Sequence, residues 1–362
     1  MRRCLLAAPL VAVLLAAVPA HASAPWVAQY VVGVAGGQQT TSWTIDHADA
    51  GACDVSQTGS GTETAAFQAG QGSPMFAAGT GTGAPRLGPS SDVLLPATVD
   101  REAQVAYGAD DGDDGPAFCA MPVASAPANP DCGPKEAQGF VDVTPTTGLG
   151  LDIQPGPSQL SGDGSPYASC AFHGVAFPTL VEPSFQLAGA SFGPKAPPSF
   201  VADGRASRPV TDPDTSGTSA IDLQLRFTRA LVTGSTRPGR GAGSLAVRRD
   251  GTLSLPLRCP KGGPACAGTM QLGTGELSVG IESSFRAGAS AFPAPVTSAE
   301  PTVASNRFRL KAGAGGRVRL RLASGRKLVA RLSRIDVDLV ESVKKGSSSL
   351  RFVIGTTHLR AR

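Results

Sequence analysis

Six cationic side chains alternate with apolar or small residues in the run N-R-F-R-L-K-A-G-A-G-G-R-V-R-L-R-L, at positions 306–322. In an extended strand every second side chain points to the same face. The cations are therefore expected to share one outward face, while the Phe, Val and Leu residues between them point into a core. A row of cations at this spacing can bind anionic groups. The six are Arg307, Arg309, Lys311, Arg317, Arg319 and Arg321.

If residues 312–316 form the turn of a single hairpin, like charges lie opposite one another, which is unfavourable unless anions approach them. The expected pairs are Lys311 with Arg317, Arg309 with Arg319 and Arg307 with Arg321. Two interpretations follow. The face is solvated and partly paired with nearby carboxylates, or it binds an anionic partner, which is either the acidic N-terminal half of the chain or an anionic cell-wall polymer. The nearby carboxylates expected are Asp222, Asp336 and Asp338.

Motifs of catalysis and cofactor binding occur only as isolated strings. Residues 189–193 read G-A-S-F-G, which matches the G-x-S-x-G pattern of a nucleophile elbow. That elbow joins a parallel strand to a helix, whereas here Pro194 follows, so we expect Ser191 to be inert. Residues 79–84 match a dinucleotide fingerprint as a string, but Pro85 prevents the helix that must follow it. No catalytic residue and no cofactor are predicted.

Acidic residues offer two further candidates. Asp110, Asp111, Asp113 and Asp114 lie in the run D-D-G-D-D-G, which could hold calcium outside the cell. The run misses the spacing of a calcium loop, with Gly where a third-position ligand belongs, so a solvated loop is favoured and no metal is predicted. The other candidate is a carbohydrate-active enzyme or carbohydrate-binding module that uses the pair Asp100 and Glu102. A cleft with two carboxyl groups about 5 to 10 Å apart would support it.

The start of the chain predicts export. Arg2 and Arg3 precede an apolar run and then P-A-H-A, so residues 1–22 are expected to be a cleaved signal peptide. The mature chain keeps six cysteines, and an even count in an exported chain favours disulfides. Zinc is less favoured because no C-x-x-C pair is present. Proximity pairs Cys259 with Cys266 and Cys119 with Cys132, which leaves Cys53 for Cys170.

These residues must be positioned by strands. The chain contains 45 Gly and 30 Pro, too many for long helices, and its apolar residues alternate over short runs. The pattern predicts an all-β chain of two immunoglobulin-like β-sandwich domains, with one short helix at residues 325–332. The expected domains are residues 23–192 and 219–362, joined by a Pro- and Gly-rich linker at 193–218. The runs are 26–32, 40–45, 139–143, 221–227, 245–257, 308–322 and 335–340.

The two expected domains carry opposite charge. Residues 23–218 contain 6 Lys+Arg and 20 Asp+Glu, which gives −14, and residues 219–362 contain 24 and 8, which gives +16. The net charge of +4 for the whole chain hides this difference. Charge asymmetry of this size bears on partners and association rather than on fold.

The C-terminal half also resembles a known kind of module. The run D-G-T-L-S-L-P-L-R-C-P-K-G-G-P-A-C, the Gly-centred cationic run and G-R-K-L-V-A-R are similar to a β-sandwich module of exported proteins of high-GC actinobacteria. The stretch T-T-S-W-T-I-D-H-A-D-A-G-A-C resembles the start of other such proteins. The resemblance implies a fold and an extracellular or cell-envelope location, and it assigns no activity to any residue. We therefore expect a non-enzymatic interaction protein of the cell envelope.

Overall fold

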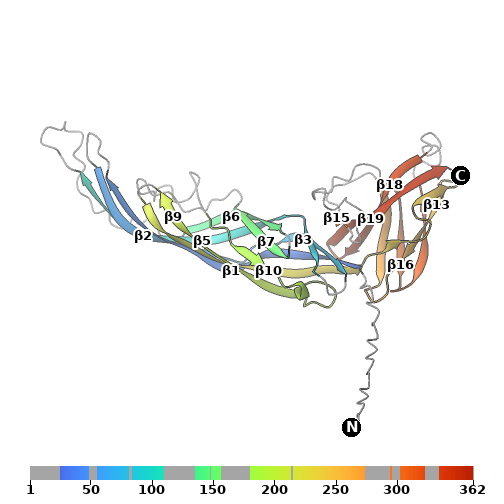
Figure 1. The fold of residues 1–362 in the computed structure, drawn as a ribbon, viewed down its shortest axis with the longest axis horizontal. Coiled ribbons are helices and arrows are strands. Elements are labelled where there is room, and N and C mark those ends of the chain that lie inside the picture. Colours follow the sequence, from blue (N-terminus) through green and yellow to red (C-terminus); the bar gives the residue numbers. More distant parts are fainter. Residues whose placement is uncertain are drawn as a thin grey trace, which may run out of the picture.

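A computed structural model describes residues 25–48, 55–80, 84–109, 135–146, 148–155, 180–212, 215–273, 294–295, 302–322 and 334–361. Most of these residues lie in strands, and the prediction of an all-β chain is confirmed. The expected signal peptide and the expected helix at 325–332 lie outside the described residues. Figure 1 shows an elongated assembly of long strands that ends, on the right, in a second group of strands near the C-terminus.

The long part is a sheet that closes on itself. Its strand order is β10-β9-β8-β7-β6-β5-β2-β1-β3-β4, and β10 also pairs with β1, so eight of the strands form a closed ring, with β3 and β4 attached beside β1. We call these eight strands, together with β3 and β4, the ring. The strands are β1 (Pro25–Ala48), β2 (Val55–Phe67), β3 (Ser73–Thr80), β4 (Arg86–Gly88), β5 (Ser91–Ala109), β6 (Lys135–Pro145), β7 (Gly150–Pro155), β8 (Ser184–Gln186), β9 (Ser199–Asp212) and β10 (Thr215–Gly234).

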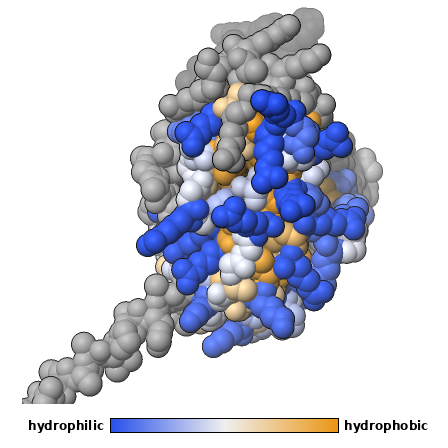
Figure 2. Space-filling view, turned by 90° about the vertical axis from the view of Figure 1, so that its right-hand side faces the viewer, coloured by the Kyte–Doolittle hydropathy of each residue, from blue (hydrophilic) through white to orange (hydrophobic). Residues whose placement is uncertain are grey.

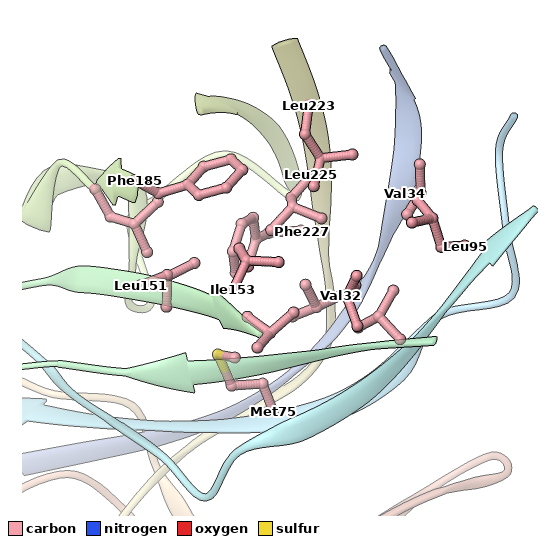
Figure 3. Close-up of a cluster of buried hydrophobic side chains, with 14 of the residues drawn as sticks. Val32, Val34, Met75, Leu95, Leu151, Ile153, Phe185, Leu223, Leu225 and Phe227 are labelled. Carbon is pink, nitrogen blue, oxygen red and sulfur yellow. The ribbon is translucent and has the colours of Figure 1, made fainter. Parts of the chain in front are cut away.

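Alternation of apolar and polar residues builds the wall of the ring. In β10, Ile221, Leu223, Leu225 and Phe227 are buried while the residues between them are not. Every second residue therefore points inward, as expected for a strand with one buried face. Figure 3 shows how side chains from β1, β3, β5, β7, β8 and β10 converge on this interior.

Two successive glycines let β1 run as one strand of 24 residues. The sequence pattern suggested separate strands at 26–32 and 40–45. Instead, a register shift between Val34 and Gly36 keeps both parts paired with β10. Gly37 has a φ of +127°, and a Cβ there would lie 2.2 Å from the backbone oxygen of Asp222. Only glycine fits such a close approach of the two strands.

The stretch expected to be a linker, residues 193–218, is instead mostly wall of the ring. Residues 199–212 form β9, and β10 begins at Thr215. The linker was predicted because prolines usually interrupt strands. Pro209 pairs with Thr218 of β10, and beyond Arg205 no described strand pairs with the other side of β9. A residue without an N–H is tolerated on such an edge.

The C-terminal part consists of two sheets that pack face to face, and we call it the sandwich. One sheet has three strands in the order β11-β13-β17, and the other has the order β12-β19-β18-β14-β16 with β15 beside β19. Leucines from both sheets fill the space between them. The strands are β11 (Arg237–Pro238), β12 (Ser244–Val247), β13 (Thr252–Arg258), β14 (Cys266–Gly273), β15 (Ala294–Pro295), β16 (Thr302–Leu310), β17 (Gly315–Arg321), β18 (Arg334–Lys345) and β19 (Ser348–Ala361).

The ring and the sandwich meet through a small apolar cluster, which we call the joint cluster. Its members are buried residues from both sides, with the start of β1, β3 and the end of β10 contributing from the ring and β18 and β19 from the sandwich. The chain passes from one part to the other at residues 234–237, where the Ser235 N–H donates to the Pro25 oxygen (3.2 Å). The members are Val27, Phe76, Ala78, Leu231, Val343, Leu350 and Phe352.

Candidate polyanion-binding face

The six predicted cations are all exposed, but they do not lie on one hairpin. Strand β16 pairs with β14 in one sheet, and β17 pairs with β13 in the other. The expected cross-strand pairs, such as Lys311 with Arg317, are therefore wrong. Residues 311–314 connect the two sheets of the sandwich, and alternation alone cannot distinguish such a connection from a hairpin because each strand buries the same side chains in both cases.

The three-stranded sheet instead gathers five arginines on its outer surface, and we call them the arginine face. Its inner surface is Leu253, Leu255 and Leu257 of β13 with Val318 and Leu320 of β17, all buried. The alternate positions point outward. Three arginines follow one another along β17 at about 6.8 Å intervals, twice the rise per residue of a strand. The face consists of Arg237, Arg258, Arg317, Arg319 and Arg321, all exposed.

The rest of the outer surface of this sheet is uncharged. Thr252, Ser254 and Pro256 of β13 lie opposite Arg321, Arg319 and Arg317. Among the residues that the structure describes, no ion pair joins the arginine face to a carboxylate. Figure 2 looks onto this end of the molecule and shows long hydrophilic side chains gathered there with hydrophobic surface between them. The face thus offers several unneutralised positive charges on one rigid sheet.

The carboxylates expected to neutralise the cations lie elsewhere. Asp222 belongs to β10 of the ring, where its Oδ2 accepts from Arg205 Nε at 3.0 Å. Asp336 lies 2.5 Å from His358 Nδ1 on the neighbouring strand β19. As expected, Val337 and Leu339 point into the core while Asp336 is exposed. Asp222 and Asp336 therefore pair with neighbouring residues and not with the arginine face.

A network around the turn at residues 311–314 holds the edges of the two sheets together. The side chain of Asn306 on β16 donates to the backbone oxygen of Arg319 on β17 (2.7 Å). The Gly313 N–H donates to the Cys259 oxygen and the Cys259 N–H to the Ala314 oxygen, each at 2.9 Å. Arg307 and Arg309 lie on β16, the edge strand of the other sheet, and are therefore not part of the arginine face.

Cys259 and Cys266 form the predicted disulfide, with Cα atoms 5.7 Å apart. Both cysteines are fully buried. The loop that they close reaches the passage from ring to sandwich, since a Cβ on Gly234 would lie 2.5 Å from the Pro264 oxygen. The other four cysteines, Cys53, Cys119, Cys132 and Cys170, lie outside the described residues, so their pairing stays a prediction.

Replacing both Cys259 and Cys266 by alanine is expected to destabilise the sandwich by about 2–3 kcal/mol. The loop-closure entropy of a loop of about eight residues accounts for a loss of this size. The measurement is denaturant unfolding of the oxidised wild type and of the double variant, with reduced wild-type protein as the control. An unchanged unfolding midpoint would show that the loop is held by its backbone hydrogen bonds alone.

Ser191 lies in a single turn of 3-10 helix, Gly189–Ser191, and not between a parallel strand and a helix. The turn anchors the segment that follows it. Gly193 donates its N–H to the Tyr30 hydroxyl at 3.1 Å, and Arg229 donates to the carbonyl oxygens of Gly193 (2.5 Å) and Ala196 (3.0 Å). The G-x-S-x-G segment thus packs against β1 and β10 through Tyr30 and Arg229. Phe192 within it is buried among aromatic rings.

The acidic candidates form no site among the described side chains. Asp100 is half-buried on the outer side of β5, because its neighbour Val99 points inward. Glu102 lies two residues further along the same strand, and its side chain is not among those described. Asp110, Asp111, Asp113 and Asp114 lie outside the described residues. In the described part of the chain, no group of three metal-ligating side chains is placed to hold an ion.

Sequence reasoning missed Arg237 and Arg258 as members of the face. Arg258 precedes Cys259 at the end of an alternating run, so its outward direction could have been read from the pattern. Arg237 gave no such signal, because β11 has only two residues, and it joins the face only through its pairing with Arg258.

The comparisons with known proteins identify no relative. No protein-family model matches the chain, and no curated protein matches it either. Among solved structures, the ectodomain of the C. elegans fusion protein EFF-1 aligns with 9% identity and a TM-score of 0.16 over 93% of this chain and 88% of that one. A variant of that ectodomain gives 8% identity and a TM-score of 0.18, over 94% and 93%. Scores this low do not establish a shared fold.

Within the described ranges, no helix has the length and apolar character needed to cross a bilayer.

Proposed function

We propose that this chain is an exported, non-enzymatic protein of the cell envelope or extracellular space, and that its arginine face binds an anionic cell-wall polymer. The observation that carries the proposal is the set of five exposed arginines on the outer surface of the three-stranded sheet, without a paired carboxylate in the described part of the chain. Export rests on the predicted signal peptide, and the buried disulfide is consistent with an oxidising compartment.

The spacing of the arginines suits a linear polymer better than a single small anion. Arg317, Arg319 and Arg321 lie on one strand, so their guanidinium groups can meet successive charges along an extended chain. Each group presents several N–H donors in a planar fork that matches phosphate and carboxylate oxygens. Because the strand is held in a sheet, little ordering of the protein backbone accompanies binding.

The proposal predicts that changing Arg317, Arg319 and Arg321 to serine weakens binding roughly 10- to 100-fold at low salt. Each exposed charge pair contributes about 0.5–1 kcal/mol, and about 1.4 kcal/mol corresponds to a tenfold change. Binding of the mature full-length chain to immobilised, phosphate-bearing polymer from a bacterial cell wall would be measured across a salt series. Wild-type affinity should fall steeply with salt, because screening shortens the Debye length to about 3 Å at 1 M.

A matched control separates the face from net charge. Changing Lys344, Lys345 and Arg360 to serine removes three exposed cations from the same sandwich but from outside the arginine face. This variant should bind within about threefold of the wild type if contacts at the face dominate. Equal weakening by both variants would show that only the overall positive charge matters. Wild-type protein that does not bind at all would contradict the proposed function.

A further inference from the structure

Glu341 is a fully buried carboxyl group that the proposed binding function does not use. It lies on β18 between Leu339, which belongs to the sandwich core, and Val343, which belongs to the joint cluster. Across the sheet its register partners are Met270 on β14 and Phe352 on β19. The carboxyl group therefore sits where the two apolar clusters meet.

The only described hydrogen bonds to this carboxyl come from the segment that connects ring and sandwich. Glu341 Oε2 accepts from the Thr236 N–H (3.1 Å) and from the Thr236 hydroxyl (2.9 Å). The other oxygen, Oε1, is buried and has no partner among the described residues. An ionised carboxylate in this position is poorly solvated, and its desolvation is expensive.

Among the described residues, only burial and the hydrogen bonds from Thr236 shift the pKa of Glu341, and no neighbouring charge contributes. The groups that face Glu341 from β14, β19 and the connecting segment are Met270, Phe352 and Thr236, and none of them titrates. The nearest charged residues along the chain point away: Arg237 and Lys344 are exposed, and Arg351 pairs in register with Ser342. Burial raises the pKa of the Glu341 carboxyl from 4.5 to about 7, and the hydrogen bonds from Thr236 oppose that shift only in part.

We propose that Glu341 makes the joint between ring and sandwich sensitive to pH: the neutral carboxyl keeps the joint closed in acid, and the joint opens more readily as the pH rises toward neutrality. Opening means local separation of residues 234–237 from β18, so that water reaches the carboxylate. The inference does not rest on polymer binding, because Glu341 is buried at the joint cluster; the segment that opens does include Arg237, which lies at one end of the arginine face.

The direction follows from proton linkage. When the joint is open, the carboxyl is in water and titrates near its ordinary pKa of 4.5. When the joint is closed, it keeps its proton up to about pH 7. Between these values the closed form binds more protons, so each pH unit favours opening by up to about tenfold, and the effect levels off above pH 7. From pH 5 to pH 7 the open population should grow roughly 30-fold.

Hydrogen exchange on the full chain tests the proposal. The readout is the protection of backbone amides in residues 231–237 from pH 5 to pH 8, after correction for the pH dependence of chemical exchange. Wild-type protection should fall roughly 30-fold up to pH 7. Protection of residues 221–227, in the middle of β10, should stay constant, which separates opening of the joint from global unfolding. Parallel loss in both segments would overturn the proposal.

Two variants complete the test. Glu341→Gln keeps the shape but cannot ionise, so protection of residues 231–237 should become independent of pH. Thr236→Val removes one donor that favours the charged form, so the loss of protection should extend to higher pH than in the wild type. His358 also lies in the sandwich, and a pH dependence that persists in Glu341→Gln would assign the effect to another group and refute the proposal. A Thr236→Val curve that coincides with the wild type would refute it as well.

Discussion

Replacing Phe227 by alanine is expected to lower the free energy of unfolding of the ring by about 3–5 kcal/mol. Large-to-small changes of a buried phenylalanine cost this much when the cavity cannot collapse. Phe227 is fully buried, and its ring stacks on that of Phe200 with centroids 4.7 Å apart and an interplanar angle of 1°. It also meets Phe192 edge-on at 6.0 Å. The surrounding strands belong to a closed ring, which limits their inward movement.

Denaturant unfolding of the wild type and the variant measures this change, with Phe140→Ala as the matched control. Phe140 is also a phenylalanine on a strand of the ring, but it is 46% exposed. Its removal should cost less than about 1 kcal/mol, because most of its apolar surface already faces water. Similar losses for the two variants would mean that the aromatic cluster around Phe227 does not hold the ring together.

Replacing Gly37 by alanine is expected to cost about 3 kcal/mol or more, although it adds a single methyl group. The backbone at Gly37 has a φ of +127°, which side-chain-bearing residues rarely adopt, and such strain alone costs about 1–3 kcal/mol. The new Cβ would also lie 2.2 Å from the Asp222 oxygen and 3.0 Å from the Leu223 Cα. Both contacts are with backbone, so β1 and β10 would have to separate locally.

Gly148→Ala separates these two causes. Gly148 also has a positive φ, +79°, but a Cβ there would meet nothing within 4 Å. This variant should show only the conformational cost, about 1–2 kcal/mol. Thermal or denaturant unfolding of both variants gives the comparison. If Gly37→Ala were no more destabilising than Gly148→Ala, the close approach of β1 and β10 would not constrain the fold.

The sequence predicted the strands better than their partners. Alternation correctly marked residues 221–227 as a strand with one buried face, because the period of two is a local property. The closure of the ring is not local. Trp26 pairs with Gly234 and Ile45 with Thr215, and nothing in either segment identifies the other. The same limitation explains why a proline-bearing segment that pairs with a distant strand was interpreted as a linker.

The candidate site shows the same division. The outward direction of Arg317, Arg319 and Arg321 followed from the apolar residues between them and is confirmed. The strands next to β17 could not be predicted from this pattern, because β16 and β17 belong to different sheets. Glu341 carried a signal that was not used: it stands between Leu339 and Val343 on the apolar side of an alternating run. A carboxylate at a core position indicates a buried titratable group.

The length of the ring has a consequence for reach. Strand β1 contains 24 residues, and at about 3.3 Å per residue it extends on the order of 75 Å. The sandwich is attached where β1 begins and β10 ends. In a molecule bound through its arginine face, the ring would therefore act as a spacer that holds its far end away from the bound surface. Because β9, β10, β1, β2 and β5 pair in this order along the far part of the ring, shortening that spacer by about 7 Å would require the removal of two residues from each of these strands at once.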